Sequence, residues 1–96
     1  MKPPAPVRFR LFVAGNSLNS SQAVANLRAL CLARLPGRHL IDIVDVFAEP
    51  QRALADSVFV TPTLLKLGPP PARRIVGNLA QTPLVLAALG LEGLDG

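Results

Sequence analysis

The sequence is poor in the residues that bind metals and carry out redox chemistry. Its 96 residues include one cysteine, one histidine and four aromatic residues, with no Trp and no Tyr. A single cysteine cannot form a disulfide within one chain, and a histidine without a nearby His or Cys is a poor metal site. No apolar run approaches the roughly 20 residues that cross a bilayer. We therefore expect no disulfide scaffold, no membrane association, no metal and no cofactor.

Length and composition indicate one small globular domain over residues 1–96, with flexible ends at 1–6 and 92–96. Half of the residues are apolar, and there are ten prolines and seven glycines. This is too hydrophobic for a disordered chain and too short for two independent cores. The first six residues lack the apolar core of a signal peptide. With one free thiol, this predicts a cytoplasmic location.

The net charge of +4 does not indicate nucleic-acid binding. The arginines are scattered, and only Arg73 and Arg74 are adjacent. No aromatic residue is interleaved with them, as a base-stacking surface would require. We expect the basic residues to meet a protein partner instead.

Hydrophobic patterning predicts a strand, a helix and a second strand in the first half of the chain. Apolar residues alternate from Val7, which indicates a strand that ends at the turn 14–17. A helix over about 21–35 follows, capped by Asn19, Ser20 or Ser21 and with Cys31 on its apolar stripe. The β-branched segment 39–46 fits a second strand, parallel to the first.

The second half predicts a short helix, a hairpin and a final helix. Residues 51–56 favour a short helix, and residues 64–67 and 72–76 form two strands joined by a Gly-Pro-Pro-Pro turn. The residues that flank the apolar run 84–89 predict a helix there. Thr82 is a good N-cap, Pro83 suits a first helical turn and Gly90 suits a left-handed C-cap.

The resulting order, βαβ-(α)-ββα, with Thr-Pro-Thr just before the third strand, is typical of the α/β thioredoxin-like architecture. Thioredoxin-like folds generally hold that proline in cis, so we predict a cis Thr61–Pro62 bond. Thiol chemistry is not expected, because the first helix begins in Asn-Ser-Leu-Asn-Ser at 16–20 where a Cys-x-x-Cys motif would be needed. Cys31 is interpreted as a buried structural residue. Asp42 and Asp45 lie on opposite strand faces and cannot act as a pair.

Several segments closely resemble the KaiB circadian clock family. They include Leu-Phe-Val-Ala-Gly-Asn-Ser at 11–17, Thr-Pro-Thr-Leu at 61–64 and Pro-Pro-Pro-Ala-Arg-Arg-Ile-Val-Gly-Asn-Leu at 69–79. The similarity runs from Val7 to Leu91.

The resemblance implies a non-enzymatic regulator that binds KaiC, a hexameric ATPase and autokinase, with KaiA or a sensor histidine kinase as further partners. It also implies a metamorphic protein. One state, usually a tetramer or dimer, has the alternative order βαββααβ, and the other is a thioredoxin-like monomer. An alternative function is a thioredoxin-like module, stress-related or bound to a sensor kinase, that acts without KaiC.

Some positions depart from the common KaiB pattern. Ala88-Leu89-Gly90 stands where the family usually carries Gly-x-Asp. Alanine in place of that glycine favours a helix by roughly 1 kcal/mol, and Gly90 creates a C-cap. We therefore expect this chain to favour the thioredoxin-like monomer. Gln22 and Ser57 replace residues that are commonly basic, which weakens the expectation of tight binding to a standard KaiC.

The candidate residues fall into two groups. The predicted partner-binding residues are Gln51, Ser57, Lys66, Arg73 and Arg74. The predicted fold-switch residues, which border or bias the segment that would change structure, are Pro62, Pro69, Pro70, Pro71, Ala88 and Gly90.

Overall fold

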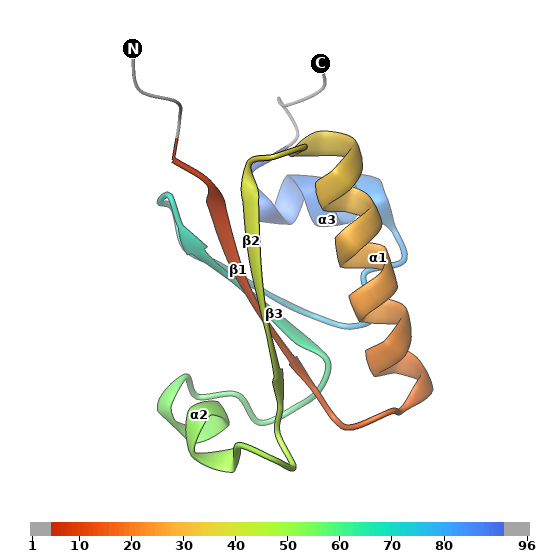
Figure 1. Ribbon diagram of the computed structural model, residues 1–96, viewed down its shortest axis with the longest axis vertical. Helices are drawn as coiled ribbons and strands as arrows, with labels where there is room; N and C mark the ends of the chain where they lie inside the picture. The colour runs from red at the N-terminus through yellow and green to blue at the C-terminus, as the bar shows by residue number, and fades with distance from the viewer. Residues whose placement is uncertain (1–4, 92–96) are drawn as a thin grey trace.

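A computed structural model describes residues 5–91 of the protein. Of the expected flexible ends at 1–6 and 92–96, residues 1–4 and 92–96 lie outside the described residues. The element order is a strand β1 and a helix α1, a strand β2 and a short helix α2, then a β3–β4 hairpin and a helix α3 (Figure 1). The bounds are β1 Val7–Val13, α1 Leu18–Arg34, β2 His39–Asp45, α2 Pro50–Ala55, β3 Thr63–Gly68, β4 Arg73–Val76 and α3 Thr82–Leu89. The predicted order βαβ-(α)-ββα is confirmed.

The four strands form one mixed sheet in the order β2-β1-β3-β4. The strand β1 pairs in parallel with β2 and antiparallel with β3, and β3 pairs antiparallel with β4. The strands β2 and β4 are therefore the two edges. The turn that joins β3 to β4 lies at the end of the sheet where β1 begins, and α2 lies at the other end (Figure 1).

Strand alternation divides the core between the two faces of the sheet. Phe9, Leu11 and Leu64 pack with apolar residues of α1 and α3 on one face. Phe12 and Leu65 pack with Ala53, Val58 and Val44 on the other. We call the first the α1/α3 face and the second the α2 face.

The helix boundaries differ from the prediction at two N-termini. The helix α1 begins at Leu18, because Ser17 rather than residues 19–21 is the N-cap, and its hydroxyl accepts a hydrogen bond from the Ser20 N–H at 3.3 Å. Ser20 is instead buried, and its hydroxyl accepts from the Ala14 N–H. The helix α3 takes Gln81 as its N-cap, so Thr82 is already helical.

Candidate functional site

Two of the predicted partner residues, Ser57 and Arg74, meet on the α2 face. The Arg74 guanidinium donates hydrogen bonds to the carbonyl oxygens of Ser57 at 3.0 Å and Asp56 at 2.5 Å. Ser57 has φ of +55°, a left-handed conformation that few residues other than glycine adopt readily. Arg74 thus fixes the strained turn that follows α2, and it ties β4 to that turn.

Lys66 and Arg73 form a second pair, on the α1/α3 face. They are opposite each other in the β3–β4 register, and Lys66 is also opposite the buried Phe9 of β1. Lys66 is only 4% exposed. Burial, and then the charge of Arg73, lowers the pKa of the Lys66 ammonium group. The structure thus divides the predicted partner residues between two faces of the sheet.

Gln51, the fifth predicted partner residue, is exposed in the first turn of α2. The helix α2 is connected to the sheet by a charged network that the sequence analysis did not identify. Arg10 donates from Nε to Asp42 at 3.0 Å and from Nη1 to Asp56 at 2.9 Å. Arg52 of α2 contacts the same Asp42 carboxylate and also Glu49. Asp42 of the edge strand β2 therefore forms ion pairs with both Arg10 of β1 and Arg52 of α2.

The network shifts the pKa of its members. Although burial alone would raise the pKa of the Asp42 carboxyl group, hydrogen bonds from Arg10 and Arg52 lower it below the ordinary value of 3.8. The hydrogen bond to Asp56 is the main cause of the raised pKa of Arg10. Only Glu49, the N-cap of α2, and Arg52 lie close together in the sequence, three residues apart. The two Arg10 contacts join residues 32 and 46 positions apart, and the Arg52–Asp42 contact joins residues 10 positions apart, so no local pattern reveals them.

Large apolar side chains are exposed beside α2. Phe47 is 76% exposed and Phe59 is 79% exposed, and Leu54 and Val60 are exposed as well. A pocket of about 220 Å³ opens here, lined by Ala14, Val46, Phe47, Ala53, Val58, Phe59, Val60 and Thr61. A cluster of exposed apolar groups on a small domain is a common mark of a protein-binding surface. The sequence analysis did not single out these two phenylalanines.

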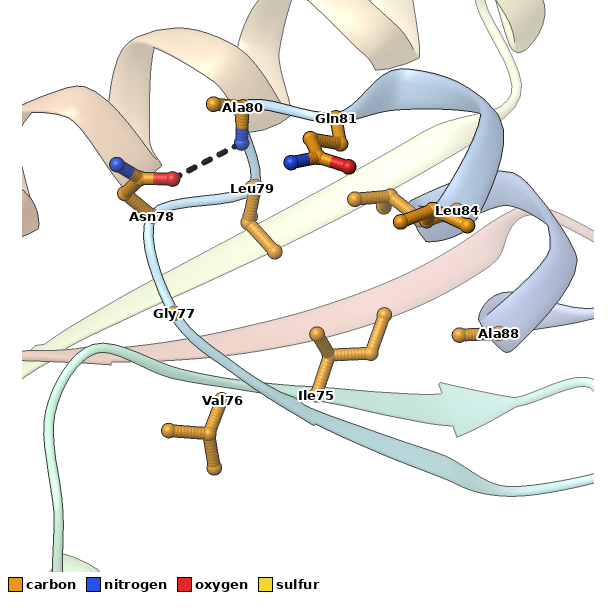
Figure 2. Close-up of a pocket in the computed structure, with 10 residues that line it drawn as sticks. Ile75, Val76, Gly77, Asn78, Leu79, Ala80, Gln81, Leu84 and Ala88 are labelled. Atoms are coloured by element: carbon orange, nitrogen blue, oxygen red, sulfur yellow. Dashed lines mark hydrogen bonds between the residues drawn. The ribbon is translucent and has the colours of Figure 1, made fainter.

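The predicted fold-switch residues lie around the β3–β4 hairpin and α3. The Thr61–Pro62 bond is cis, as predicted, and the Gly68–Pro69 and Pro70–Pro71 bonds of the turn are cis as well. Gly90 has φ of +72° and ends α3 in the predicted left-handed cap. Figure 2 shows Ala88 at a pocket of about 280 Å³ between β4 and α3, with Ile75 and Leu84 also at its wall.

Cys31 is fully buried, as predicted. Burial raises the pKa of its thiol to about 11, so the reactive thiolate is scarce at neutral pH. Within residues 5–91, no three His, Cys, Asp or Glu side chains are grouped so that they could hold a metal ion. In the same residues, no helix has the length and apolar character needed to cross a membrane.

The fold belongs to the thioredoxin-like class. Similar solved structures include the N-terminal domain of SasA from Synechococcus elongatus, with a TM-score of 0.73 and 21% identity, covering 95% of this chain and 87% of that domain. Mitochondrial thioredoxin 3 from Saccharomyces cerevisiae gives a TM-score of 0.69 and 19% identity, with coverage of 88% and 77%. The predicted fold class is confirmed, and the single cysteine separates this chain from dithiol members of the class.

Sequence comparison identifies the family within this class. Residues 10–91 match the KaiB domain. Circadian clock protein KaiB3 from Synechocystis sp. is 44% identical over 88 residues, covering 90% of this chain and 86% of the relative. Circadian clock oscillator protein KaiB from Prochlorococcus marinus is 41% identical over 91 residues, covering 95% and 76%. The chain belongs to the KaiB family, whose members are named as clock proteins.

Proposed function

We propose that the protein is a non-enzymatic, cytoplasmic regulator that binds a KaiC-type ATPase. The observation that carries this proposal is the coincidence of a KaiB domain over residues 10–91 with a thioredoxin-like fold over the same residues. In the KaiB family, the thioredoxin-like form is the one expected to bind KaiC. KaiA and a sensor histidine kinase are proposed as further partners of the same complex.

The surface beside α2 is the proposed centre of the contact. It presents Gln51, the Ser57 turn and the Arg74 guanidinium next to exposed Leu54 and Phe59. Apolar groups that lose water on binding supply affinity, and flanking cations steer an acidic partner. Because Arg74 connects β4 to the turn after α2, this surface exists only when the hairpin and α2 are arranged as they are here.

The proposal includes a change of fold in the C-terminal half. In the alternative βαββααβ arrangement the apolar run 84–89 is a strand and the chain is a tetramer or dimer, whereas the thioredoxin-like form is a monomer. The switch requires two packings that differ by only a few kcal/mol. Pro62 and the Pro69 to Pro71 turn border the segment that changes, and Ala88 and Gly90 favour the helix within it.

A pull-down with the KaiC proteins of the same organism, with ATP and with a non-hydrolysable analogue, tests the proposal. We expect the unmodified chain to be retained, and the variant Arg73→Glu with Arg74→Glu to lose at least tenfold in binding. The matched control, Arg28→Glu with Arg38→Glu, makes the same charge change at two exposed positions and should bind as the unmodified chain does. Retained binding after reversal at Arg73 and Arg74 overturns the surface assignment. Failure of every KaiC protein to retain the unmodified chain overturns the proposed partner.

A further inference from the structure

The acidic side chains in the described part of the chain all interact with groups other than Lys66 and Arg73. Residues 5–91 contain four carboxylates. Asp42, Glu49 and Asp56 belong to the network that holds α2. Asp45 accepts hydrogen bonds from the N–H groups of Gly15 and Phe47. None of the four pairs with a cation on the α1/α3 face of the hairpin.

Within residues 5–91, Lys66 and Arg73 therefore form a cationic pair without a counter-charge. Lys66 is almost completely buried, and within the described residues the structure records neither a hydrogen bond nor an ion pair for its ammonium group. Its cross-strand neighbour Arg73 is exposed and carries the same charge. No buried side-chain nitrogen or oxygen atom in the described residues lacks a hydrogen-bond partner, so the Lys66 ammonium group, which makes no such bond, reaches the surface beside Arg73.

A solute can reach this part of the sheet. An open pocket of about 330 Å³ runs along the β3–β4 hairpin, and its lining combines Lys66 and Arg73 with residues of the α2 face, among them Leu65, Leu67 and Arg74. The strand β4 is an edge, so no further strand covers Arg73. Arg74, which lines this pocket, also donates hydrogen bonds to the turn after α2, so the pocket adjoins the proposed contact surface beside α2.

We propose that Lys66 and Arg73 bind a dianionic phosphoryl group. Two adjacent cations are neutralised by one dianion, whereas a single carboxylate compensates only one of them. A guanidinium group presents a planar set of donors that matches phosphoryl oxygens, and an ammonium group adds a compact charge beside it. The group can come from free phosphate or from a phosphate monoester, since both carry the same chemistry.

The test is a titration of the isolated full-length chain with inorganic phosphate, AMP or acetate at constant ionic strength, followed by amide NMR shifts. We expect saturable shifts at residues 64–67 and 72–75 with phosphate or AMP and none with acetate. A tighter response to AMP identifies an ester as the source, and an equal response identifies the free ion. Equal shifts with acetate, or shifts that do not saturate, overturn the proposal.

Two variants and one control complete the test. Lys66→Met and Arg73→Gln should each weaken phosphate binding at least tenfold, and Arg28→Gln on α1 should leave it within twofold. Methionine suits the buried position of Lys66, so the variant should fold. Phosphate should also raise the melting temperature of the unmodified chain and not that of Lys66→Met. Unchanged phosphate affinity in both variants would mean that Lys66 only extends its ammonium group to water.

This inference does not depend on the proposed KaiC-type partner. The titration uses the chain alone, so its failure leaves the pull-down result unaffected. A chain that binds phosphate but retains no KaiC would overturn only the proposed function.

Discussion

The Asn78 side chain connects the loop before α3 to the first helix by donating a hydrogen bond to Gln22 Oε1 at 3.1 Å. Asn26 of the same helix donates to the Asn78 carbonyl oxygen at 2.8 Å, and the Asn78 side chain also accepts from the Ala80 N–H (Figure 2). These bonds join residues 52 and 56 positions apart. Gln22 therefore supports this arrangement of the C-terminal half.

Replacing Gln22 by Met should destabilise the described fold by about 0.5 kcal/mol, since the bond is exposed and a typical hydrogen bond contributes about 0.5–1.5 kcal/mol. Asn78→Ala should cost about twice as much, because both bonds of its side chain are lost. Urea unfolding followed by circular dichroism gives the free energies. The control is Gln81→Met, at an exposed glutamine that makes no side-chain capping bond. An equal loss in the control would contradict the role of Gln22.

Arg10 should be a major support of α2. Arg10→Met leaves Asp42 and Asp56 without their shared partner, and we expect a loss of about 1–2 kcal/mol in the free energy of unfolding. Hydrogen exchange should increase first at α2, which the network holds to the sheet. Arg28→Met, at an exposed arginine of α1, should change the free energy by less than about 0.5 kcal/mol. Unchanged exchange at α2 in Arg10→Met would argue against this role.

The same network predicts a pH dependence below about pH 4. The pKa of Asp42 is lower in the folded protein than its ordinary value of 3.8. Its contribution is therefore complete above that value and is lost as the pH falls through the lower, folded value. We expect the stability difference between the unmodified chain and Asp42→Asn to shrink between pH 4 and pH 2 in urea unfolding. A difference that stays constant over this range would show that Asp42 is not the titrating group.

The element order could be predicted because its signals are local. Alternation from Val7, the Gly-Pro-Pro-Pro turn and the Gly90 cap each depend on a few neighbouring residues. The start of α1 was misplaced, because four polar residues at 17 and 19–21 can all cap a helix. Which of them does so depends on the turn after β1, where Ser20 is drawn inward to bond the Ala14 N–H.

The candidate site was less predictable, because its geometry is set by strand register. Arg73 and Arg74 are adjacent in sequence but belong to opposite faces of the sheet, where one lies beside Lys66 and the other holds the Ser57 turn. The sequence also gives no sign that Lys66 is buried, since that follows from its place opposite Phe9. The sequence identified these basic residues as candidates, but only the pairing of β1, β3 and β4 shows that they lie on two different faces of the sheet.

Cys31 should be inert in the folded protein. Its thiol is buried and its pKa is raised to about 11, so a disulfide reagent at pH 8 should label it only as fast as the chain unfolds. A Ser21→Cys variant in a Cys31→Ala background, with its thiol at an exposed position of α1, should label within the mixing time of a manual assay. Equal labelling rates for the two chains, or turnover in an insulin-reduction assay, would contradict the non-enzymatic interpretation.

Two residues at the end of α3 should control the balance between the two proposed folds. Ala88→Gly lowers helix propensity by about 1 kcal/mol, and Gly90→Ala places a side chain at φ of +72°, at a cost of roughly 1–2 kcal/mol. Both changes weaken α3, which the proposed alternative fold replaces by a strand. We expect the double variant to show strand-like NMR shifts at 84–89 and a larger apparent mass in size-exclusion chromatography.

The matched control is Ala25→Gly, at an exposed position of α1, which both folds retain. It lowers helix propensity by a similar amount but should destabilise both folds equally, so it should change the urea midpoint without changing the mass or the shifts at 84–89. If the double variant behaves as this control does, residues 88 and 90 affect stability alone. The proposed bias toward a thioredoxin-like monomer would then need another cause, and the Gln22–Asn78 hydrogen bond of the described fold is the candidate that the structure offers.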